Sequence, residues 1–157
     1  MTRTETKVVT TSSEIETERF GMFLGHRITG DLCVSLVGSL GSGKSVLVRG
    51  VCKGLGIDEE VLSPTFILCE EYRGRIPVIH LDLYRLDHER EIEELGVFDR
   101  IGDGSLMLVE WGDRSAQILD ASDIVLNIEM TGTNERRIGI GYTAACAEII
   151  DDTVGEF

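Results

Sequence analysis

One eight-residue stretch has the residue types and spacing of a phosphate-binding loop. It fits the pattern G-x-x-x-x-G-K-[ST], in which glycines allow several backbone N–H groups to point at one anion. The lysine supplies a full charge for the outer phosphates of a nucleotide, and the serine hydroxyl can bind Mg²⁺. An apolar run precedes the stretch, and the helix expected after it would add its positive N-terminal end. The predicted phosphate-binding residues are Gly38, Ser39, Leu40, Gly41, Ser42, Gly43, Lys44 and Ser45.

A magnesium nucleotide also needs a carboxylate, and two residues are candidates. Glu110 ends the apolar run 106–109, and Asp82 ends the mostly apolar run 78–81. Sheets of α/β proteins bind their ligands where parallel strands end, and both residues meet that condition. Composition does not rank the two. Either one could instead be a polar residue that merely ends a strand.

The segment Ser63-Pro64-Thr65-Phe66 follows the expected helix. Proline keeps the residue before it extended, so Thr65 would be presented from a stiff loop. Nucleotide switches place a threonine that senses Mg²⁺ and the γ-phosphate in such a loop. The alternative is an ordinary loop before a strand.

Other polar side chains lie close to these candidates in the sequence. His80 and Asp82 share one face of their strand, because they are two residues apart. We expect His80 to be a hydrogen-bonded structural histidine, with a general base as the alternative. Arg85 could face phosphate charge or pair with the acidic residues of 89–94, which we expect to form a solvated helix face. Trp111 is expected to be a packing residue.

The pattern of apolar residues and turns predicts an α/β fold. Strands and helices alternate early in the chain, and strands dominate later. We predict a P-loop NTPase-like mixed, mainly parallel sheet with flanking helices and a C-terminal β-hairpin, in one domain over residues 1–157. Residues 148–157 contain four acids and no base, and we predict a partly frayed tail there. The expected strands are 7–11, 32–37, 66–72, 76–83, 106–109, 123–130 and 137–143, and the expected helices begin at Ser13, Gly43 and Asp87.

Composition limits the partners and the compartment. The 157 residues include 28 acids and 15 bases, so the net charge of −13 disfavours binding to bare nucleic acid and anionic membranes. No apolar run approaches the roughly 20 residues that span a bilayer, and the first residues have no signal-peptide core. The four cysteines form no C-x-x-C pair, which predicts buried reduced thiols. We therefore expect a cytoplasmic protein without membrane contact.

Five stretches, in this order, resemble those of the TsaE family, also called YjeE. The phosphate-binding loop is common to many families, whereas the combination of S-P-T-[FY], H-x-D-x-Y-R and E-W is much more specific. The resemblance covers residues 38–111, and chain length and the expected order of elements agree outside that window. The matching stretches are Gly38–Ser45, Ser63–Phe66, His80–Leu86, Glu94–Gly96 and Val109–Trp111.

The resemblance implies a bacterial ATPase that is needed for the threonylcarbamoyladenosine modification of tRNA. The implied cofactors are ATP and Mg²⁺. The implied partners are the TsaB and TsaD proteins, through which the chain would reach tRNA only indirectly. The implied roles are metal binding by Ser45 and Glu110, a switch role for Thr65, a place near the γ-phosphate for Asp82, and a place near the adenine for Thr11 and Arg137. The phosphate-binding pattern itself predicts a catalytic role for Lys44.

Three positions depart from the usual pattern of that family. Ser39 stands where Asp is usual, Gly112 where Pro is usual, and Ser45 where Thr is frequent. Ser45 keeps the hydroxyl that would bind metal. The departures at Ser39 and Gly112 concern loop geometry only.

Two other functions stay open, and a third is excluded. A small-molecule kinase would share the phosphate-binding loop, as would an interaction module that binds a nucleotide without turnover. A GTPase of the N-K-x-D type is excluded, because none of Lys7, Lys44 and Lys53 follows an asparagine. The densest basic group, Arg73, Arg75 and Arg85, is too small to track RNA, and we expect it to recognise a protein surface or a phosphate.

Overall fold

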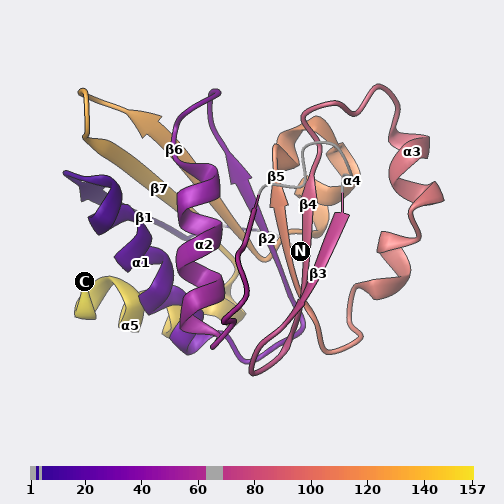
Figure 1. Cartoon of the computed structure of the whole chain (residues 1–157), viewed down its shortest axis with the longest axis horizontal. Coiled ribbons are helices and arrows are strands. Elements are labelled where there is room, and N and C mark those ends of the chain that lie inside the picture. Colours follow the sequence, from indigo (N-terminus) through magenta and orange to yellow (C-terminus); the bar gives the residue numbers. More distant parts are fainter. Residues whose placement is uncertain (1–2, 4, 63–68) are drawn as a thin grey trace.

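The computed structural model describes residues 3, 5–62 and 69–157, and a seven-stranded sheet forms the centre of that part of the chain (Figure 1). The spatial order of the strands is β1-β7-β6-β2-β5-β4-β3. The neighbours β6, β2, β5 and β4 run parallel, whereas β7 and β3 run antiparallel to their neighbours. The predicted mixed sheet and its late hairpin, β6–β7, are confirmed. The strands are β1 (Glu5–Thr11), β2 (Leu32–Val37), β3 (Cys69–Arg73), β4 (Pro77–Asp82), β5 (Leu106–Glu110), β6 (Ile124–Met130) and β7 (Arg136–Tyr142).

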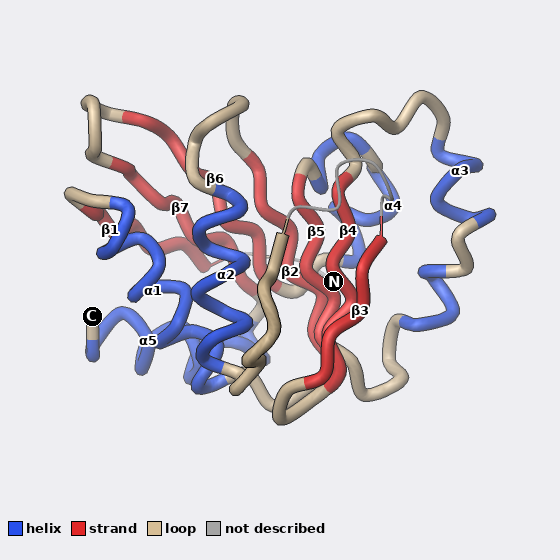
Figure 2. Tube along the Cα trace, viewed as in Figure 1, coloured by secondary structure: helices blue, strands red, loops and turns tan. Residues whose placement is uncertain are grey.

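Helices cover both faces of the sheet (Figure 2). One face packs on α1, α2 and α5 through residues such as Phe20, Leu47 and Ile150, and the other packs on α3 and α4 through Ile92 and Ile118. This double cover explains why β5 is buried along its whole length. No helix in the described part of the chain is both long and apolar enough to cross a membrane. The helices are α1 (Glu14–Arg27), α2 (Lys44–Gly54), α3 (Glu89–Glu94), α4 (Ala116–Ala121) and α5 (Ala147–Glu156), with 3₁₀ turns at Val97–Arg100, Gly112–Arg114 and Ala144–Cys146.

Helices α1 and α2 approach each other closely because glycines lie at their contact. A Cβ atom at Gly25 would lie 2.2 Å from the Val51 carbonyl oxygen, and one at Gly50 would lie 2.1 Å from the Glu18 carbonyl oxygen. Neither position has room for a side chain. The helix that follows the phosphate-binding loop is therefore packed directly against α1.

Arg75 joins the carboxyl ends of these two helices. Its Nη2 donates to the carbonyl oxygens of Gly25 (3.0 Å) and Ile28 (2.6 Å), and Nη1 lies 3.4 Å from the carbonyl oxygen of Gly54. Its backbone N–H donates to Leu55 at 2.7 Å. A cation at a helix C-terminus also matches the helix dipole. From the sequence we expected Arg75 to recognise a protein surface or a phosphate, whereas in the structure it stabilises the fold.

The predicted start of α1 is confirmed. Ser13 is the N-cap, and its side chain accepts a hydrogen bond from the Glu16 N–H at 3.1 Å. The Glu16 carboxylate reaches one residue further back than expected, to the N–H of Ser12 (2.6 Å) and its hydroxyl (2.7 Å). These hydrogen bonds lower the pKa of Glu16.

The prediction of a frayed tail over residues 148–157 is wrong. These residues form most of α5, in which Ile150 and Thr153 are buried, and the Phe157 ring lies edge-on to Phe20 at 5.4 Å. The prediction rested on the four acidic residues of this segment. The apolar residues between them recur at helical spacing, and their burial against α1 outweighs the repulsion of exposed, screened charges.

All four cysteines are free thiols, as predicted. Cys33, Cys52 and Cys146 are buried, and Cys69 is partly buried. Burial raises the pKa of Cys33 to about 11 and that of Cys52 to about 12. These thiols are therefore protonated packing residues.

Candidate nucleotide site

The carboxyl ends of β2, β5 and β4 lie side by side and border a cavity of about 390 Å³. The phosphate-binding loop leaves the end of β2, Glu110 ends β5 and Asp82 ends β4. β5 lies between the other two strands, so Glu110 is directly next to the loop. The cavity is lined by Glu14, Thr17, Leu40, Gly41, Ser42, Gly43, Lys44, Ser45, Val46, Asp82, Tyr84, Glu110, Trp111 and Arg136.

The loop turns back on itself before α2 begins. The Ser42 N–H donates to the Ser39 carbonyl at 3.1 Å, and the Leu47 N–H donates to the Gly43 carbonyl at 3.1 Å. Gly43 is the N-cap of α2 and has φ = 113°, a conformation that favours glycine. The glycine of the sequence pattern is therefore needed for the backbone to enter the helix with its first N–H groups at the cavity.

Lys44 is folded back onto the loop. Its Nζ donates to the carbonyl oxygens of Gly38 (2.7 Å) and Ser39 (2.8 Å) and lies 4.0 Å from the centroid of the Trp111 ring. Burial lowers the pKa of Lys44, and the nearby carboxylate of Glu110 counteracts that shift. The ammonium group is therefore held at the cavity wall by neutral carbonyl oxygens, which negatively charged phosphate oxygens can replace.

Three side chains form a hydrogen-bonded line from the cavity into the sheet. The Ser45 hydroxyl donates to Glu110 Oε1 at 2.9 Å, and His80 Nε2 lies 2.6 Å from Glu110 Oε2. The exposed fractions of the Glu110 and His80 side chains are 3% and 1%. Composition did not rank Glu110 and Asp82, whereas the family resemblance implied Glu110, and the structure brings Glu110 to the serine of the loop.

Asp82 lies beside Glu110 at the same cavity wall. The two residues are direct register partners in the parallel pair β4–β5. Asp82 Oδ1 accepts a hydrogen bond from the Tyr84 N–H at 2.9 Å, which fixes the carboxylate at the strand end. The cavity thus has two carboxylates close to the phosphate-binding loop.

The chemistry of these donors fits Mg²⁺. A serine hydroxyl and a carboxylate are hard oxygen ligands, and Mg²⁺ in nucleotide sites uses few protein ligands together with phosphate oxygens and water. The described residues contain no group of three His, Cys, Asp or Glu side chains that could hold a metal ion alone. Ser45 and Glu110 therefore suit a metal that arrives with a nucleotide rather than a permanent metal cage.

Trp111 packs against the core as expected, and it also lines the cavity. Its backbone has φ = 60°, which is uncommon for a residue with a side chain, and its N–H donates to the Leu36 carbonyl at 2.9 Å. Its ring lies 5.0 Å from that of Tyr84, and the guanidinium of Arg114 lies 5.6 Å from it. The turn after β5 thus places an aromatic ring over Lys44.

The opposite end of the cavity is formed by α1 and the start of β7. Thr17 lines it, and its hydroxyl is 2.7 Å from that of Thr11, which is buried behind it. Arg136 also lines it and donates from Nε to the Ser42 carbonyl at 2.7 Å. Arg137 is not among the lining residues, and its guanidinium lies 3.8 Å from Glu129.

Sequence reasoning therefore missed Arg136. The predicted strand 137–143 began one residue too late and left Arg136 out. Because adjacent residues of a strand point to opposite faces, Arg136 and Arg137 cannot both face the cavity. Thr65 and its Ser63–Phe66 segment lie outside the described residues, and the switch role stays a prediction.

Comparison with known proteins agrees with this arrangement. A family model described as "Threonylcarbamoyl adenosine biosynthesis protein TsaE" matches residues 11–138. Among proteins named "tRNA threonylcarbamoyladenosine biosynthesis protein TsaE", that of Treponema pallidum is 32% identical over 125 residues, covering 80% of this chain and 93% of its own. That of Bacillus subtilis is 36% identical over 122 residues, covering 74% and 76%. The crystal structure of Bacillus subtilis YdiB has the same fold, with a TM-score of 0.80 over 97% of this chain and 96% of that one, at 23% identity.

Proposed function

This chain belongs to the TsaE family, and we propose that it is a magnesium-dependent ATPase that supports the formation of threonylcarbamoyladenosine in tRNA. The observation that carries the ATPase proposal is the cavity in which the phosphate-binding loop, Lys44, Ser45 and Glu110 meet. The role in tRNA modification rests on the family and on the names of the relatives.

The site offers positioning and electrostatic stabilisation for phosphoryl transfer. Lys44 would exchange the carbonyl oxygens of Gly38 and Ser39 for phosphate oxygens, while loop N–H groups hold the same phosphates. Ser45 and Glu110 would hold Mg²⁺, which when bound neutralises charge on the phosphate oxygens. Asp82 would orient the attacking water near the γ-phosphate. The nucleoside would lie toward Thr17 and Arg136, with Thr11 behind Thr17.

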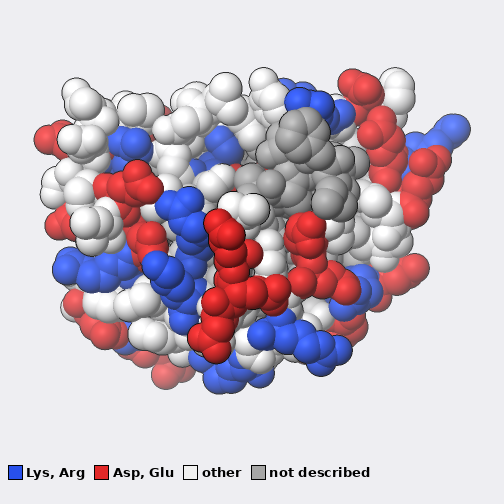
Figure 3. All heavy atoms as spheres, in the orientation of Figure 1, with Lys and Arg blue, Asp and Glu red and all other residues white. Residues whose placement is uncertain are grey.

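We propose that the chain acts as a subunit with the TsaB and TsaD proteins. On the face drawn in Figure 3, acidic and basic side chains are interspersed, which does not suit binding along RNA phosphates. The net charge of −13 also disfavours binding to RNA phosphates. Contact with tRNA would therefore be indirect. The protonated, unpaired cysteines favour a reducing compartment, and we place the protein in the cytoplasm.

Hydrolysis assays test the proposal. We expect slow phosphate release from ATP with Mg²⁺ by the isolated protein, less from GTP, and faster release with TsaB and TsaD, because partners can complete the stabilisation of charge. Lys44→Ala should weaken Mg-ATP binding at least tenfold, or about 1.4 kcal/mol, in calorimetry. The matched control is Lys53→Ala, an exposed lysine paired with Glu18, which should leave the affinity unchanged.

Three results would contradict the proposal. Unchanged affinity in Lys44→Ala would remove the phosphate-binding role of the loop. Transfer of the phosphate to a small molecule would identify a kinase, and the absence of turnover with TsaB and TsaD present would identify a binding module.

A charge reversal tests docking of the partners. Arg75 is unsuitable for this purpose because its guanidinium caps α1 and α2. Arg73→Glu alone should reduce stimulation by TsaB and TsaD more than it reduces nucleotide affinity. Equal effects on both quantities would exclude Arg73 from the docking surface.

A further inference from the structure

His80 is buried next to the cavity but does not line it. Its exposed fraction is 1%, and the cavity wall contains Asp82 and Glu110 without His80. A general base must reach the reacting proton directly or through one water. The alternative of His80 as a base therefore has no geometric support, and its role must pass through its neighbour.

The sheet register explains how His80 meets Glu110. His80 is opposite Leu108 and Asp82 is opposite Glu110, so His80 is the diagonal neighbour of Glu110 on the same face of the sheet. Diagonal neighbours are within reach of long side chains. The imidazole thus approaches the carboxylate from inside the sheet, while Ser45 approaches it from the cavity.

The two oxygens of Glu110 have separate partners. Oε1 accepts from the Ser45 hydroxyl, and Oε2 lies 2.6 Å from His80 Nε2. The Glu110 backbone is held independently, because its carbonyl accepts from the Leu83 N–H at 3.0 Å. The bond to His80 therefore fixes the orientation of the carboxylate and is not needed to hold the strand.

The other nitrogen of the ring is poorly satisfied. Nδ1 of His80 is buried and has no hydrogen-bond partner among the described residues. A buried polar atom without a partner destabilises the folded state. The ring therefore makes its one hydrogen bond through Nε2, to Oε2 of Glu110, and that bond is the use the site has for the histidine.

We propose that His80 is a positioning residue of the magnesium site: its Nε2–H holds Oε2 of Glu110 so that Oε1 faces Ser45. This inference rests on the proposed function, because it assumes that Ser45 and Glu110 hold Mg²⁺. Groups that hydrogen-bond a metal-binding carboxylate typically change metal affinity 10- to 100-fold when removed.

The test measures how much Mg²⁺ the protein needs to bind ADP. ADP affinity is determined by calorimetry over a series of Mg²⁺ concentrations and in EDTA, for wild type, His80→Phe, His80→Gln and Glu110→Ala. The glutamine keeps an N–H donor close to the position of Nε2, and the phenylalanine keeps only the ring shape. His26→Phe is the matched control, because His26 is exposed and lies outside the cavity lining.

We expect the half-saturating Mg²⁺ concentration to rise about tenfold in His80→Phe and to return within about threefold of wild type in His80→Gln. ADP affinity in EDTA and the His26→Phe titration should not change. In the Glu110→Ala background, adding His80→Phe should have no further effect.

Other outcomes separate the inference from the proposed function. If Glu110→Ala leaves the Mg²⁺ dependence intact, the magnesium assignment is wrong and the inference is overturned with it. If Glu110→Ala abolishes the dependence but His80→Phe lowers only thermal stability, the inference alone is overturned. If His80→Phe does not fold, His80→Gln is compared in the wild-type and Glu110→Ala backgrounds instead. The retained N–H donor should keep the Mg²⁺ requirement close to that of wild type, so a requirement more than about tenfold higher overturns the inference.

Discussion

Two clusters of polar and charged side chains lie at opposite ends of the central strands. The first is the Ser45–Glu110–His80 line at the carboxyl ends, and its Glu110 and His80 side chains are 3% and 1% exposed. The second, which we call the Arg100 cluster, joins Arg100 to Glu71 and Asp103, and the side chains of Arg100 and Glu71 are 40% and 60% exposed. Both clusters are built around a glutamate, and their burial differs greatly.

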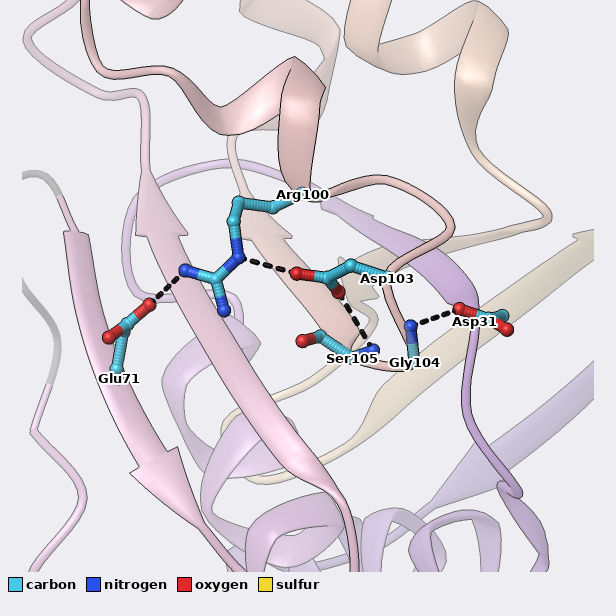
Figure 4. Close-up of polar contacts among 6 residues, drawn as sticks. All are labelled: Asp31, Glu71, Arg100, Asp103, Gly104 and Ser105. Atoms are coloured by element: carbon cyan, nitrogen blue, oxygen red, sulfur yellow. Dashed lines mark hydrogen bonds and ion pairs between the residues drawn. The ribbon is translucent and has the colours of Figure 1, made fainter.

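The Arg100 cluster organises a loop (Figure 4). The Asp103 carboxylate accepts from Arg100 and from the Ser105 N–H, and the Asp31 carboxylate accepts from the Gly104 N–H. These contacts tie the 3₁₀ turn after α3 to the edge strand β3 and to the amino end of β5. Exposed ion pairs are screened by water and salt, so the cluster can be weakened at little cost.

The buried line behaves differently. Removing one partner of a buried hydrogen bond costs more than removing one from an exposed ion pair, because water replaces a buried partner less readily. Burial also strengthens electrostatic interactions within the cavity. The comparison teaches that a glutamate alone does not mark a site suited to chemistry: the buried one does so here, whereas the exposed one helps to shape a loop.

The largest difference should appear when one glutamate is removed from each cluster. Glu110→Ala should lower ADP affinity in Mg²⁺ to its value in EDTA and reduce ATP turnover about 100-fold, or about 2.7 kcal/mol, because the proposed metal ligand is lost. Glu71→Ala should leave both quantities unchanged. If instead Asp82→Ala abolishes the Mg²⁺ dependence and Glu110→Ala does not, the metal ligand lies on β4.

A second difference concerns two arginines. Arg75→Met should lower the free energy of unfolding by about 1–2 kcal/mol in urea titrations, because carbonyl groups of α1 and α2 lose a charged donor. Arg100→Met should have a smaller effect, since water and salt already screen its ion pairs. Equal losses in the two variants would show that the exposed cluster contributes as much as the helix caps.

Tryptophan emission reports on the cavity that contains Lys44 and Glu110. Trp111 is the only tryptophan, and its ring lies 4.0 Å from Lys44 Nζ. Mg-ADP should shift its emission, because Lys44 leaves the ring for the phosphates, and the shift should be smaller in Glu110→Ala. Arg100→Met should not change it. Identical spectra with and without Mg-ADP would mean that Lys44 stays under the ring.

The smallest expected effect is a pH dependence in the Arg100 cluster. The hydrogen bond from Arg100 lowers the pKa of Asp103 to about 2 from 3.8. A folded-state pKa below the unfolded value stabilises the protein above the unfolded value, and that contribution disappears as the pH falls through the folded one. Wild type should therefore exceed Asp103→Asn slightly in stability at pH 6, and the difference should vanish between pH 4 and pH 2. It should also shrink in about 1 M salt. If the stability difference between wild type and Asp103→Asn persists at pH 2, it arises from packing rather than from the ion pair.

Most of the fold could be predicted from the sequence, because its central elements have clear local patterns. The strand 32–37 was placed correctly since its apolar run is bounded by a turn and the glycine-rich loop. The helix α4 was not predicted, because its six residues show no helical period, whereas the equally short α3 stands in an acidic run closed by Gly96. The helix α5 was misjudged, because its acidic residues obscured an apolar stripe whose partner, α1, is more than 100 residues away in sequence.

The sequence by itself determined the phosphate-binding loop. Its glycines, lysine and serine are contiguous, so their geometry follows from local backbone conformation and from the helix that begins at Lys44. Local chemistry also made Asp82 and Glu110 candidates, since each follows an apolar run.

Only the tertiary structure decided which carboxylate meets Ser45 and which arginine meets the loop. Strand order places β5 next to β2, so Glu110 rather than Asp82 receives the serine hydroxyl, and no property of either residue encodes that order. The register of β7 likewise brings Arg136 to the cavity. Pairing between strands distant in sequence depends on the packing of the whole core, and a shift of one residue reverses every side chain in a strand.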